Sequence, residues 1–337
     1  MNKPILPSDA PIGITFFTGG GGVDTGLVLG GVRPACGVEL DPKNPGLSRQ
    51  MAIAHSFNFR EYGSTLIESS IQDVAANGFP DIPRNPSFCH FSPVCSQFSS
   101  AKSNGEESFH DITSAIAIGK AIAQLQPKNI SLEQVSSYCT SKSYRIIIKT
   151  LEEEGYQYRA EVVNFADYGI PQRRLRLILL ASKSGLFSFP QKRPQAGWGK
   201  TIEGLQLTPT NLCDYQSAAI ASYLANNPRP KMLLLERYNN KRRPIHVRAG
   251  DESCWTIIKS AFHDQRGGNR LIPFTAWIDG QAYELPMRAI ARICGFPDWY
   301  ILPDQTAIAG SILGYAVPPR FIEALIKDNY LALQLNS

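Results

Sequence analysis

The residue best placed for chemistry in this chain is a single cysteine. Cys95 stands in FSPVCSQFSS, just past Pro93 and after an apolar segment that is expected to form a strand. Ligand sites of α/β domains form in loops at the carboxyl ends of strands, and a deprotonated cysteine there can act as a nucleophile. The alternative is a buried structural thiol, the commoner fate of free cysteine. We expect that fate for the other six cysteines: Cys36, Cys89, Cys139, Cys213, Cys254 and Cys294.

A run of four glycines, Gly19 to Gly22, lies in FFTGGGGVD between an expected strand and an expected helix. Glycines at such a turn let a ligand approach the main chain and the helix N-terminus. Glu39 closes the next apolar run, where a carboxylate can hold the hydroxyl pair of a ribose. A tight turn without a ligand is the plain alternative, but the following acid favours a nucleoside-containing cofactor. Nicotinamide, flavin and S-adenosylmethionine cofactors all remain open on this evidence.

The elements that must position these residues alternate between strand and helix. Over residues 12–185, apolar runs typical of strands alternate with amphipathic segments such as ITSAIAIGKAIAQL and YRIIIKTLEEE. This alternation predicts an α/β fold with a doubly wound, largely parallel sheet. After Ser182 the chain is rich in turns, and helix patterns return at PMRAIARICGF and near the C-terminus. We therefore expect a first domain over 1–187, a smaller irregular domain over 188–284, and a segment 285–337 that returns to the first domain.

Composition excludes several classes of protein. The chain has 337 residues, of which 43% are hydrophobic, so it is not a disordered chain. It contains no run of 18 apolar residues, and its start does not resemble a signal peptide, so we expect no membrane anchor. Seven cysteines without regular spacing exclude a disulfide scaffold and fit a reducing compartment. No Cys or His set has metal-ligand spacing, so we expect no metal site.

The net charge of +5 is too small to name a partner, but its distribution is uneven. Residues 188–284 hold 13 Lys and Arg against 8 Asp and Glu, which accounts for the whole excess. The cluster KRRPIHVR in this stretch suits contacts with phosphates and a few base edges. A solvated surface arginine is the alternative at each position. The candidates for DNA contacts are Arg242, Arg243, Arg248, Arg266 and Arg270.

Eight segments, taken in order, resemble motifs of the cytosine-C5 DNA methyltransferases. Four come first: an F-x-G-x-G-G loop at Phe17–Gly22, a ribose-binding acid at Glu39, an adenine-contacting acid at Asp73, and P-P-C-Q-x-F-S around Cys95, here PVCSQFS. Four follow: E-N-V as EQV, Q-x-R-x-R as QRRLR, R-x-x-A-R-x-x-G-F-P as RAIARICGFP, and G-N-x-V-P-P as GYAVPP. The resemblance covers 13–183 and about 285–327, and the unmatched stretch falls where the family places its target-recognition domain.

The resemblance implies a Rossmann-like methyltransferase that uses S-adenosylmethionine to methylate C5 of a cytosine flipped out of DNA. A thiolate that adds at C6 makes C5 nucleophilic, which assigns this role to Cys95. Glu133 of EQV would hold N3 and the exocyclic amine of the base. The implied catalytic set is completed by Gln172, Arg174 and Arg176, the arginines being permanently charged donors.

The same resemblance implies the cofactor contacts and the partners. The expected contacts with S-adenosylmethionine are Phe17, Thr18, Gly19, Gly21, Gly22, Glu39, Leu40, Asp73, Val74, Tyr315 and Ala316. Residues 97–111 correspond to a loop that closes over the flipped base, and Ser99 and Lys102 are expected to touch phosphates. We expect a cytoplasmic, prokaryotic or phage-encoded monomer that acts on double-stranded DNA. A restriction endonuclease acting as a separate protein is an open partner.

Five positions depart from the family motifs: Val94, Ser96, Gln134, Cys294 and Tyr315. Because Cys95, Glu133 and the Gln/Arg triplet are kept, we expect an active enzyme, which disfavours a catalytically dead DNA-binding homologue. Tyr315 would alter the pocket near the methionine part of the cofactor, so a modified cofactor or product stays open. A tRNA cytosine-C5 methyltransferase is a further alternative, disfavoured by the separate basic module. A nicotinamide oxidoreductase would need none of the motifs from Cys95 onward.

Overall fold

The computed structural model describes residues 2–94, 107–227, 230–237, 245–263 and 272–334. The chain divides into two compact units. The large unit comprises Asn2–Asn164, Leu175–Gln191 and Ala316–Ser337, and the small unit comprises Phe165–Arg174 and Lys192–Tyr315. The domain boundaries expected after residues 187 and 284 are based on changes in composition along the sequence. In the structure, the C-terminal segment passes from the small unit to the large unit after Tyr315.

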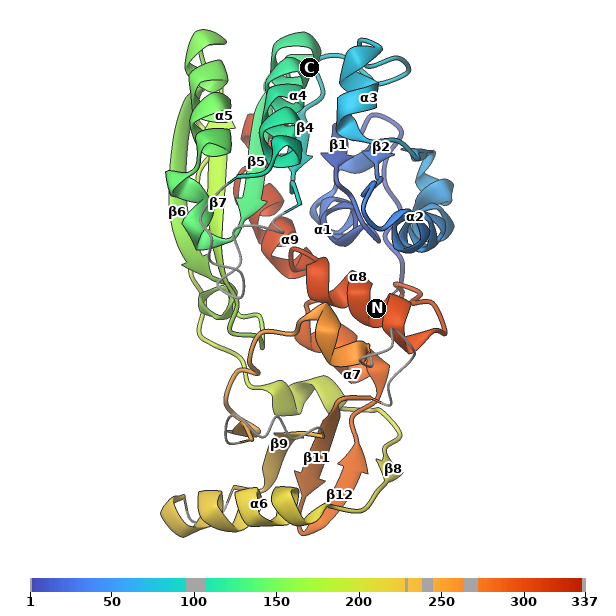
Figure 1. Ribbon diagram of the computed structural model, residues 1–337, viewed down its shortest axis with the longest axis vertical. Helices are drawn as coiled ribbons and strands as arrows, with labels where there is room; N and C mark the ends of the chain where they lie inside the picture. The colour runs from blue at the N-terminus through green and yellow to red at the C-terminus, as the bar shows by residue number, and fades with distance from the viewer. Residues whose placement is uncertain (1, 95–106, 228–229, 238–244, 264–271, 335–337) are drawn as a thin grey trace. The chain divides into compact units, whose positions relative to one another are not determined.

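Among the described residues, seven strands form the sheet of the large unit, in the order β3-β2-β1-β4-β5-β7-β6 (Figure 1). Their bounds are β1 Ile12–Phe16, β2 Arg33–Val38, β3 Thr65–Ile67, β4 Phe88–Phe91, β5 Asn129–Gln134, β6 Gln157–Asn164 and β7 Leu175–Ser182. The first five strands pair in parallel, and β7 runs antiparallel to both β5 and β6. The predicted doubly wound, largely parallel α/β fold is therefore confirmed.

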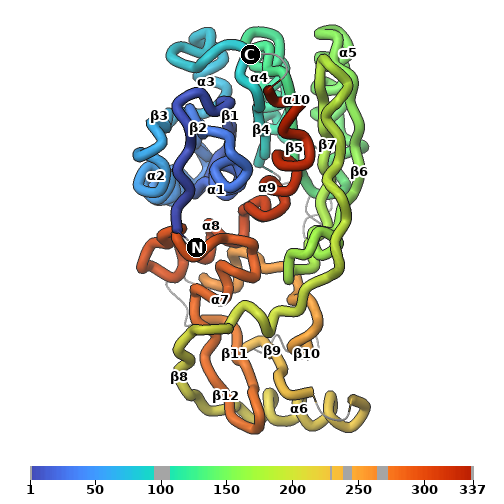
Figure 2. The backbone as a smooth tube through the Cα atoms, turned by 180° about the vertical axis from the view of Figure 1, so that it is seen from behind, coloured from blue at the N-terminus to red at the C-terminus, as the bar shows by residue number. Residues whose placement is uncertain are grey.

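Helices cover both faces of this sheet (Figures 1 and 2). Their bounds are α1 Gly22–Gly30, α2 Pro45–Phe59, α3 Ile71–Ala76, α4 Phe109–Leu125, α5 Lys142–Glu153, α9 Pro319–Asp328 and α10 Tyr330–Gln334. The main core joins α3, α4 and α5 to the sheet side chains that include Phe16, Phe91 and Leu179. Helices α1 and α9 lie on the opposite face and pack against each other.

Local sequence explains where the expected helices begin and end. Helix α4 starts at Phe109 because Ser108 and Asp111 form a capping box, in which each side chain accepts the other's backbone N–H. Helix α5 is capped by Ser141, whose hydroxyl accepts the N–H of Tyr144. The chain then turns at Gly155, whose φ of 75° suits glycine.

The small unit contains an antiparallel sheet in the order β10-β9-β11-β12-β8. Its elements are β8 Thr208–Pro209, α6 Asp214–Asn226, β9 Met232–Glu236, β10 Val247–Ala249, β11 Phe274–Ile278, β12 Gln281–Glu284, α7 Met287–Ile293 and α8 Thr306–Tyr315. Helix α6 packs Ile220 against Leu233 and Leu235 of β9. This unit is more regular than the irregular domain that the sequence indicates. Its strands are short, and Leu233–Leu235 are all buried, so the sequence does not show the apolar–polar alternation typical of a strand.

Two general features bear on function. Within the described ranges, no helix is both long and apolar enough to cross a membrane. The same ranges contain no group of three or more His, Cys, Asp and Glu side chains arranged to hold a metal ion.

Candidate active site

The candidate site lies at one edge of the large unit's sheet. Strands β1, β2, β4 and β5 are parallel, so the loops that follow them meet at the same edge. The glycine loop follows β1, Glu39 follows β2, the segment leading to Cys95 follows β4, and Glu133 is the penultimate residue of β5. The antiparallel strand β7 starts at this edge and brings Arg176 to it.

The glycine loop and Glu39 are joined directly. The backbone N–H of Gly19 donates a 2.8 Å hydrogen bond to Oε2 of Glu39. Burial raises the pKa of Glu39, and the bond from Gly19 partly offsets that effect. Strand β2 thus delivers its terminal carboxylate to the start of the loop.

The glycines of the loop have different roles. A Cβ at Gly21 would lie 2.3 Å from the ring of Phe59, and one at Gly22 would lie 2.9 Å from Cβ of Ala316, so packing excludes side chains there. At Gly19, by contrast, φ is +56° and no heavy atom lies within 4 Å of the Cβ position. The main chain is therefore open at Gly19. Beside it lies the buried carboxylate of Glu39, which can accept hydrogen bonds from hydroxyl groups. These features fit the nucleoside part of a cofactor.

The remaining predicted cofactor residues lie in different settings. Asp73 belongs to the first turn of α3, where its carboxylate accepts a 2.6 Å hydrogen bond from Ser70. Val74 packs in the core, Leu40 follows Glu39 half-buried, and Ala316 abuts Gly22. Tyr315 belongs to the small unit, where the ammonium group of Lys259 lies 4.8 Å from the centre of its ring. Direct contact of these residues with a cofactor stays a prediction.

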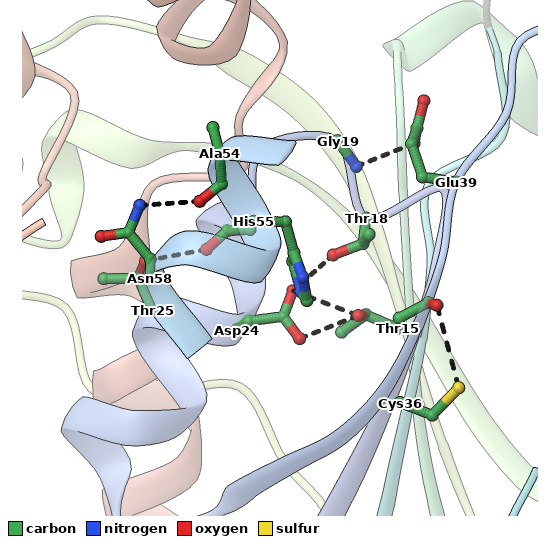
Figure 3. A network of polar contacts seen from close by, with 12 residues as sticks. Thr15, Thr18, Gly19, Asp24, Thr25, Cys36, Glu39, Ala54, His55 and Asn58 are labelled. Carbon is green, nitrogen blue, oxygen red and sulfur yellow. Dashed lines mark hydrogen bonds and ion pairs between the residues drawn. The ribbon is translucent and has the colours of Figure 1, made fainter. Parts of the chain in front are cut away.

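A buried polar network lies beneath the glycine loop (Figure 3). Asp24, in the first turn of α1, is fully buried. Its carboxylate accepts hydrogen bonds from Thr15 at 2.9 and 3.1 Å and from Thr18 at 2.5 Å. Nε2 of His55 on α2 lies 3.5 Å from the same carboxylate. Sequence reasoning missed Asp24 and His55 because nothing in the pattern indicates which polar residues are buried.

Glu133 is held by two neighbours at the edge of the sheet. Ser92, just after β4, donates a 2.8 Å hydrogen bond to its Oε2, and Nε of Arg176 lies 2.9 Å from its Oε1. Ser92 is a further residue that sequence reasoning did not single out. Next to it, the amide of Gln134 donates a 2.7 Å hydrogen bond to the carbonyl of Pro93. Both contacts tie the end of β5 to the segment that leads to Cys95.

The residues of the Gln/Arg triplet belong to two compact units. Arg174 belongs to the small unit, where its Nη1 donates to the carbonyls of Ile257 and Gly314 at 3.2 and 3.0 Å. Gln172 is buried in the same unit and donates a 3.2 Å hydrogen bond to Sγ of Cys294. Of the three side chains, Arg176 alone has Glu133 as its described partner. Catalytic roles for Gln172 and Arg174 stay predictions.

Several predicted residues lie outside the described ranges, and nothing structural is said of them. They are Cys95, Ser96, Ser99, Lys102, Arg242, Arg243, Arg266 and Arg270. Arg248 is described: it lies on β10, half-buried, and its Nη1 donates a 3.3 Å hydrogen bond to the carbonyl of Val247.

Comparison with a solved structure defines the class of fold. A putative DNA modification methyltransferase encoded in an E. coli prophage superposes with a TM-score of 0.63. The match covers 96% of this chain and 100% of that chain at 16% identity, so it establishes the fold. The large unit is therefore a Rossmann-like methyltransferase fold.

Sequence comparison then defines the family. The profile of the C-5 cytosine-specific DNA methylases matches residues 13–330, so the chain belongs to this family. The type II methyltransferase M.XorII of Xanthomonas oryzae pv. oryzae is 28% identical over 187 residues, which is 52% of this chain and 41% of that protein. The type II methyltransferase M.NgoPII of Neisseria gonorrhoeae is 24% identical over 336 residues, 90% of this chain and 91% of that protein. The chain thus spans less than half the length of the first of these relatives.

Proposed function

We propose that this protein transfers the methyl group of S-adenosylmethionine to C5 of a cytosine in a specific sequence of double-stranded DNA, giving 5-methylcytosine. The observation that carries the proposal is the position of Glu133. It is fixed by Ser92 and Arg176 at the end of β5, next to the segment that carries Cys95. The glycine loop and Glu39 lie at the same edge of the sheet. Family membership supports the reaction class.

Cys95 is the proposed nucleophile. C5 of cytosine is a poor nucleophile because it belongs to an aromatic ring. When the Cys95 thiolate adds to C6, the ring loses aromaticity and C5 becomes enamine-like. After methyl transfer, a base removes the C5 proton, the C5–C6 double bond re-forms, and the thiolate leaves. Covalent catalysis of this kind requires the cytosine to be flipped out of the helix.

Glu133 is proposed to hold the cytosine ring during this reaction. A carboxyl group at N3 can share a proton with the ring and accept a hydrogen bond from the exocyclic amine. The bond from Ser92 and the ion pair with Arg176 restrain the orientation of that carboxyl group. Arg176 also places a permanent positive charge beside the ring, which favours negative charge that develops there.

The cofactor site is proposed at Gly19 and Glu39. S-adenosylmethionine, when bound, supplies an electrophilic methyl group on a sulfonium. Glu39 would accept hydrogen bonds from the ribose hydroxyls, and the open main chain at Gly19 would let the cofactor approach closely. Neighbouring residues of the predicted set, including Asp73 and Ala316, would complete the pocket.

DNA is the proposed macromolecular partner. The excess positive charge of the chain lies within 188–284, which suits phosphate contacts from this part of the protein. Arg248 of β10 is the described member of the proposed contact set, together with the arginines and loop residues outside the described ranges. The type II names of the relatives support a restriction endonuclease, acting as a separate protein, as a functional partner.

The test is methyl transfer by the purified chain with labelled S-adenosylmethionine, offered DNA and tRNA in parallel. We expect label in DNA and 5-methylcytosine in its digest by mass spectrometry. Label in tRNA alone would favour the tRNA enzyme, and a different modified base would favour an altered product. DNA that contains 5-fluorocytosine should trap the unaltered chain covalently, whereas Cys95→Ala should not be trapped. Trapping or turnover by Cys95→Ala would overturn the mechanism.

A further inference from the structure

Asp24 is the most completely enclosed carboxylate beneath the glycine loop. It lies in α1, two residues after Gly22, and its side chain has no solvent exposure. Hydrogen bonds reach it from two hydroxyls, one in β1 and one in the loop. Thr15 belongs to the strand interior, whereas Thr18 immediately precedes Gly19. The carboxylate therefore links the helix, the strand and the loop at one point (Figure 3).

Nε2 of His55 lies 3.5 Å from the carboxylate of Asp24. Burial raises the pKa of Asp24, but the proximity of His55 and the hydrogen bonds from Thr18 and Thr15 outweigh that effect, so its pKa lies below the usual value. Other titratable groups face the pair from neighbouring strands. Burial lowers the pKa of His90 on β4 to about 3 and raises that of Cys36 on β2 to about 11, so both are neutral. Glu39, at the end of β2, is an acid and cannot supply a positive charge.

A fully buried carboxylate is a poor source of net stability, because desolvation cancels much of what its contacts contribute. It is, however, demanding in geometry, since each partner must stay within hydrogen-bond reach. The atom that Asp24 fixes most closely is Oγ1 of Thr18, at 2.5 Å. The next residue is Gly19, which is open to a ligand and bonded to Glu39. The network thus acts on the part of the loop where the proposed cofactor would bind.

We propose that Asp24 is a positioning residue for the cofactor loop: it holds Thr18, and through Thr18 the backbone of Gly19. This inference rests on the proposed function for the identity of the ligand. It adds a residue, Asp24, that none of the sequence motifs singled out.

The role of Asp24 is tested with two matched threonine variants of the full chain. Thr15→Val and Thr18→Val each remove one hydroxyl that donates to Asp24, but only Thr18 lies in the loop. Calorimetric titration should give a Kd for S-adenosylmethionine that is unchanged in Thr15→Val. The Kd should be at least tenfold weaker in Thr18→Val and in Asp24→Asn. The double variant Asp24→Asn/Thr18→Val should bind no more weakly than the worse single variant.

The outcomes separate this inference from the proposed function. If the unaltered chain binds no S-adenosylmethionine, the cofactor assignment fails. If it binds but Asp24→Asn binds within twofold of it, the positioning role fails while the cofactor assignment stands. Additive losses in the double variant would mean that Thr18 touches the cofactor directly and would overturn the link through Asp24. Should Asp24→Asn not fold, the comparison of Thr15→Val with Thr18→Val decides: equal affinities would overturn the proposal.

Discussion

Nε of Arg176 on β7 lies 2.9 Å from Oε1 of Glu133 on β5, and Ser92 binds the other oxygen of the same carboxylate. Glu133 is 8% exposed and Arg176 is 18% exposed, so water screens this pair little. Removing one partner leaves the other charge buried. Arg176→Met should therefore lower the free energy of unfolding by about 3–5 kcal/mol, as measured by urea unfolding.

A second arginine–glutamate pair in the same sheet provides the control. Arg159 and Glu161 on β6 are 2.7 Å apart, but Arg159 is 74% exposed. Arg159→Met should change stability by less than about 1 kcal/mol. In the double variant Glu133→Gln/Arg176→Met both charges are absent, so part of the free energy of unfolding that Arg176→Met loses should return. Methyl transfer should be lost in this double variant, because Glu133 is proposed to hold the cytosine ring. Equal effects of Arg176→Met and Arg159→Met would mean that the Glu133 pair is not energetically distinct.

Gln134 offers a test of how the Cys95 segment is held. Its amide donates a 2.7 Å hydrogen bond to the carbonyl of Pro93 and its Oε1 accepts the N–H of Val135 at 2.6 Å. Gln134→Ala leaves the Pro93 carbonyl without this donor, which should cost about 1–3 kcal/mol. Because Pro93 leads to Cys95, we also expect methyl transfer to slow on the order of tenfold or more, measured as kcat with labelled cofactor.

Asn129 makes the equivalent link at the other end of β5. Its amide donates a 3.0 Å hydrogen bond to the carbonyl of Ser87, before β4. Asn129→Ala should lower stability to a similar extent but leave kcat near that of the unaltered chain. A loss of rate in both variants that follows their loss of stability would argue against a specific role for Gln134.

Much of the large unit is predictable from the sequence because its periodicity is clear. The apolar runs and glycine turns of β1, β2 and β7 and the amphipathic patterns of α4 and α5 all correspond to observed elements. Helix α2 is not evident, because its buried Met51 and Phe59 are interspersed with serine, asparagine and histidine. His55 lies in this helix, so its meeting with Asp24 depends on a tertiary contact that local patterns do not encode.

The Gln/Arg triplet shows a second limit. The resemblance to the Q-x-R-x-R motif implies a catalytic role for Gln172, Arg174 and Arg176, which alternate along the sequence. However, β7 begins only at Leu175, and Arg174 and Gln172 belong to a different compact unit from Arg176. Spacing indicates a common direction only while the residues share one strand. The described hydrogen-bond and ion-pair partners of the three side chains therefore differ, and their shared catalytic role stays a prediction.

His90 on β4 predicts an acid sensitivity of the fold. Burial lowers its pKa from 6.5 to about 3, although the negative charge of Asp24 acts in the opposite sense. Between these values the unfolded chain binds a proton that the folded chain does not, so stability falls as pH decreases from about 6.5. The loss should be on the order of 2 kcal/mol by about pH 4.5.

The variant His90→Asn tests this origin because asparagine does not titrate and can still bond with Ser131, which lies 2.7 Å from Nδ1 of His90. Urea unfolding between about pH 4.5 and 7.5 should show a stability difference between the two proteins that shrinks toward acid. Parallel stability curves for the two proteins would indicate that His90 does not contribute to the acid sensitivity.

The contact between α1 and α9 leaves no room for a side chain at Gly26 of α1, so we expect even alanine there to destabilise the protein. A Cβ at Gly26 would lie 2.4 Å from Cβ of Ile322 and 2.6 Å from the carbonyl oxygen of Pro319, neither of which can rotate away. Gly26→Ala should therefore destabilise the protein by about 1–3 kcal/mol despite the higher helix propensity of alanine. Gly46→Ala in α2 is the control, since no atom lies within 4 Å of its Cβ position, and a gain of about 0.4–1 kcal/mol is expected.

This contact also bears on the proposed cofactor site. The same pair of segments places Ala316 beside Gly22, where a Cβ would lie only 2.9 Å from that of Ala316. If Gly26→Ala pushes α9 away from α1, it should shift Ala316 as well and weaken S-adenosylmethionine binding, as measured by calorimetry. Gly46→Ala should bind the cofactor as the unaltered chain does. A Gly26→Ala variant that is as stable as Gly46→Ala would contradict the predicted clash, and a destabilised Gly26→Ala variant with unchanged affinity would show that this contact does not position the cofactor site.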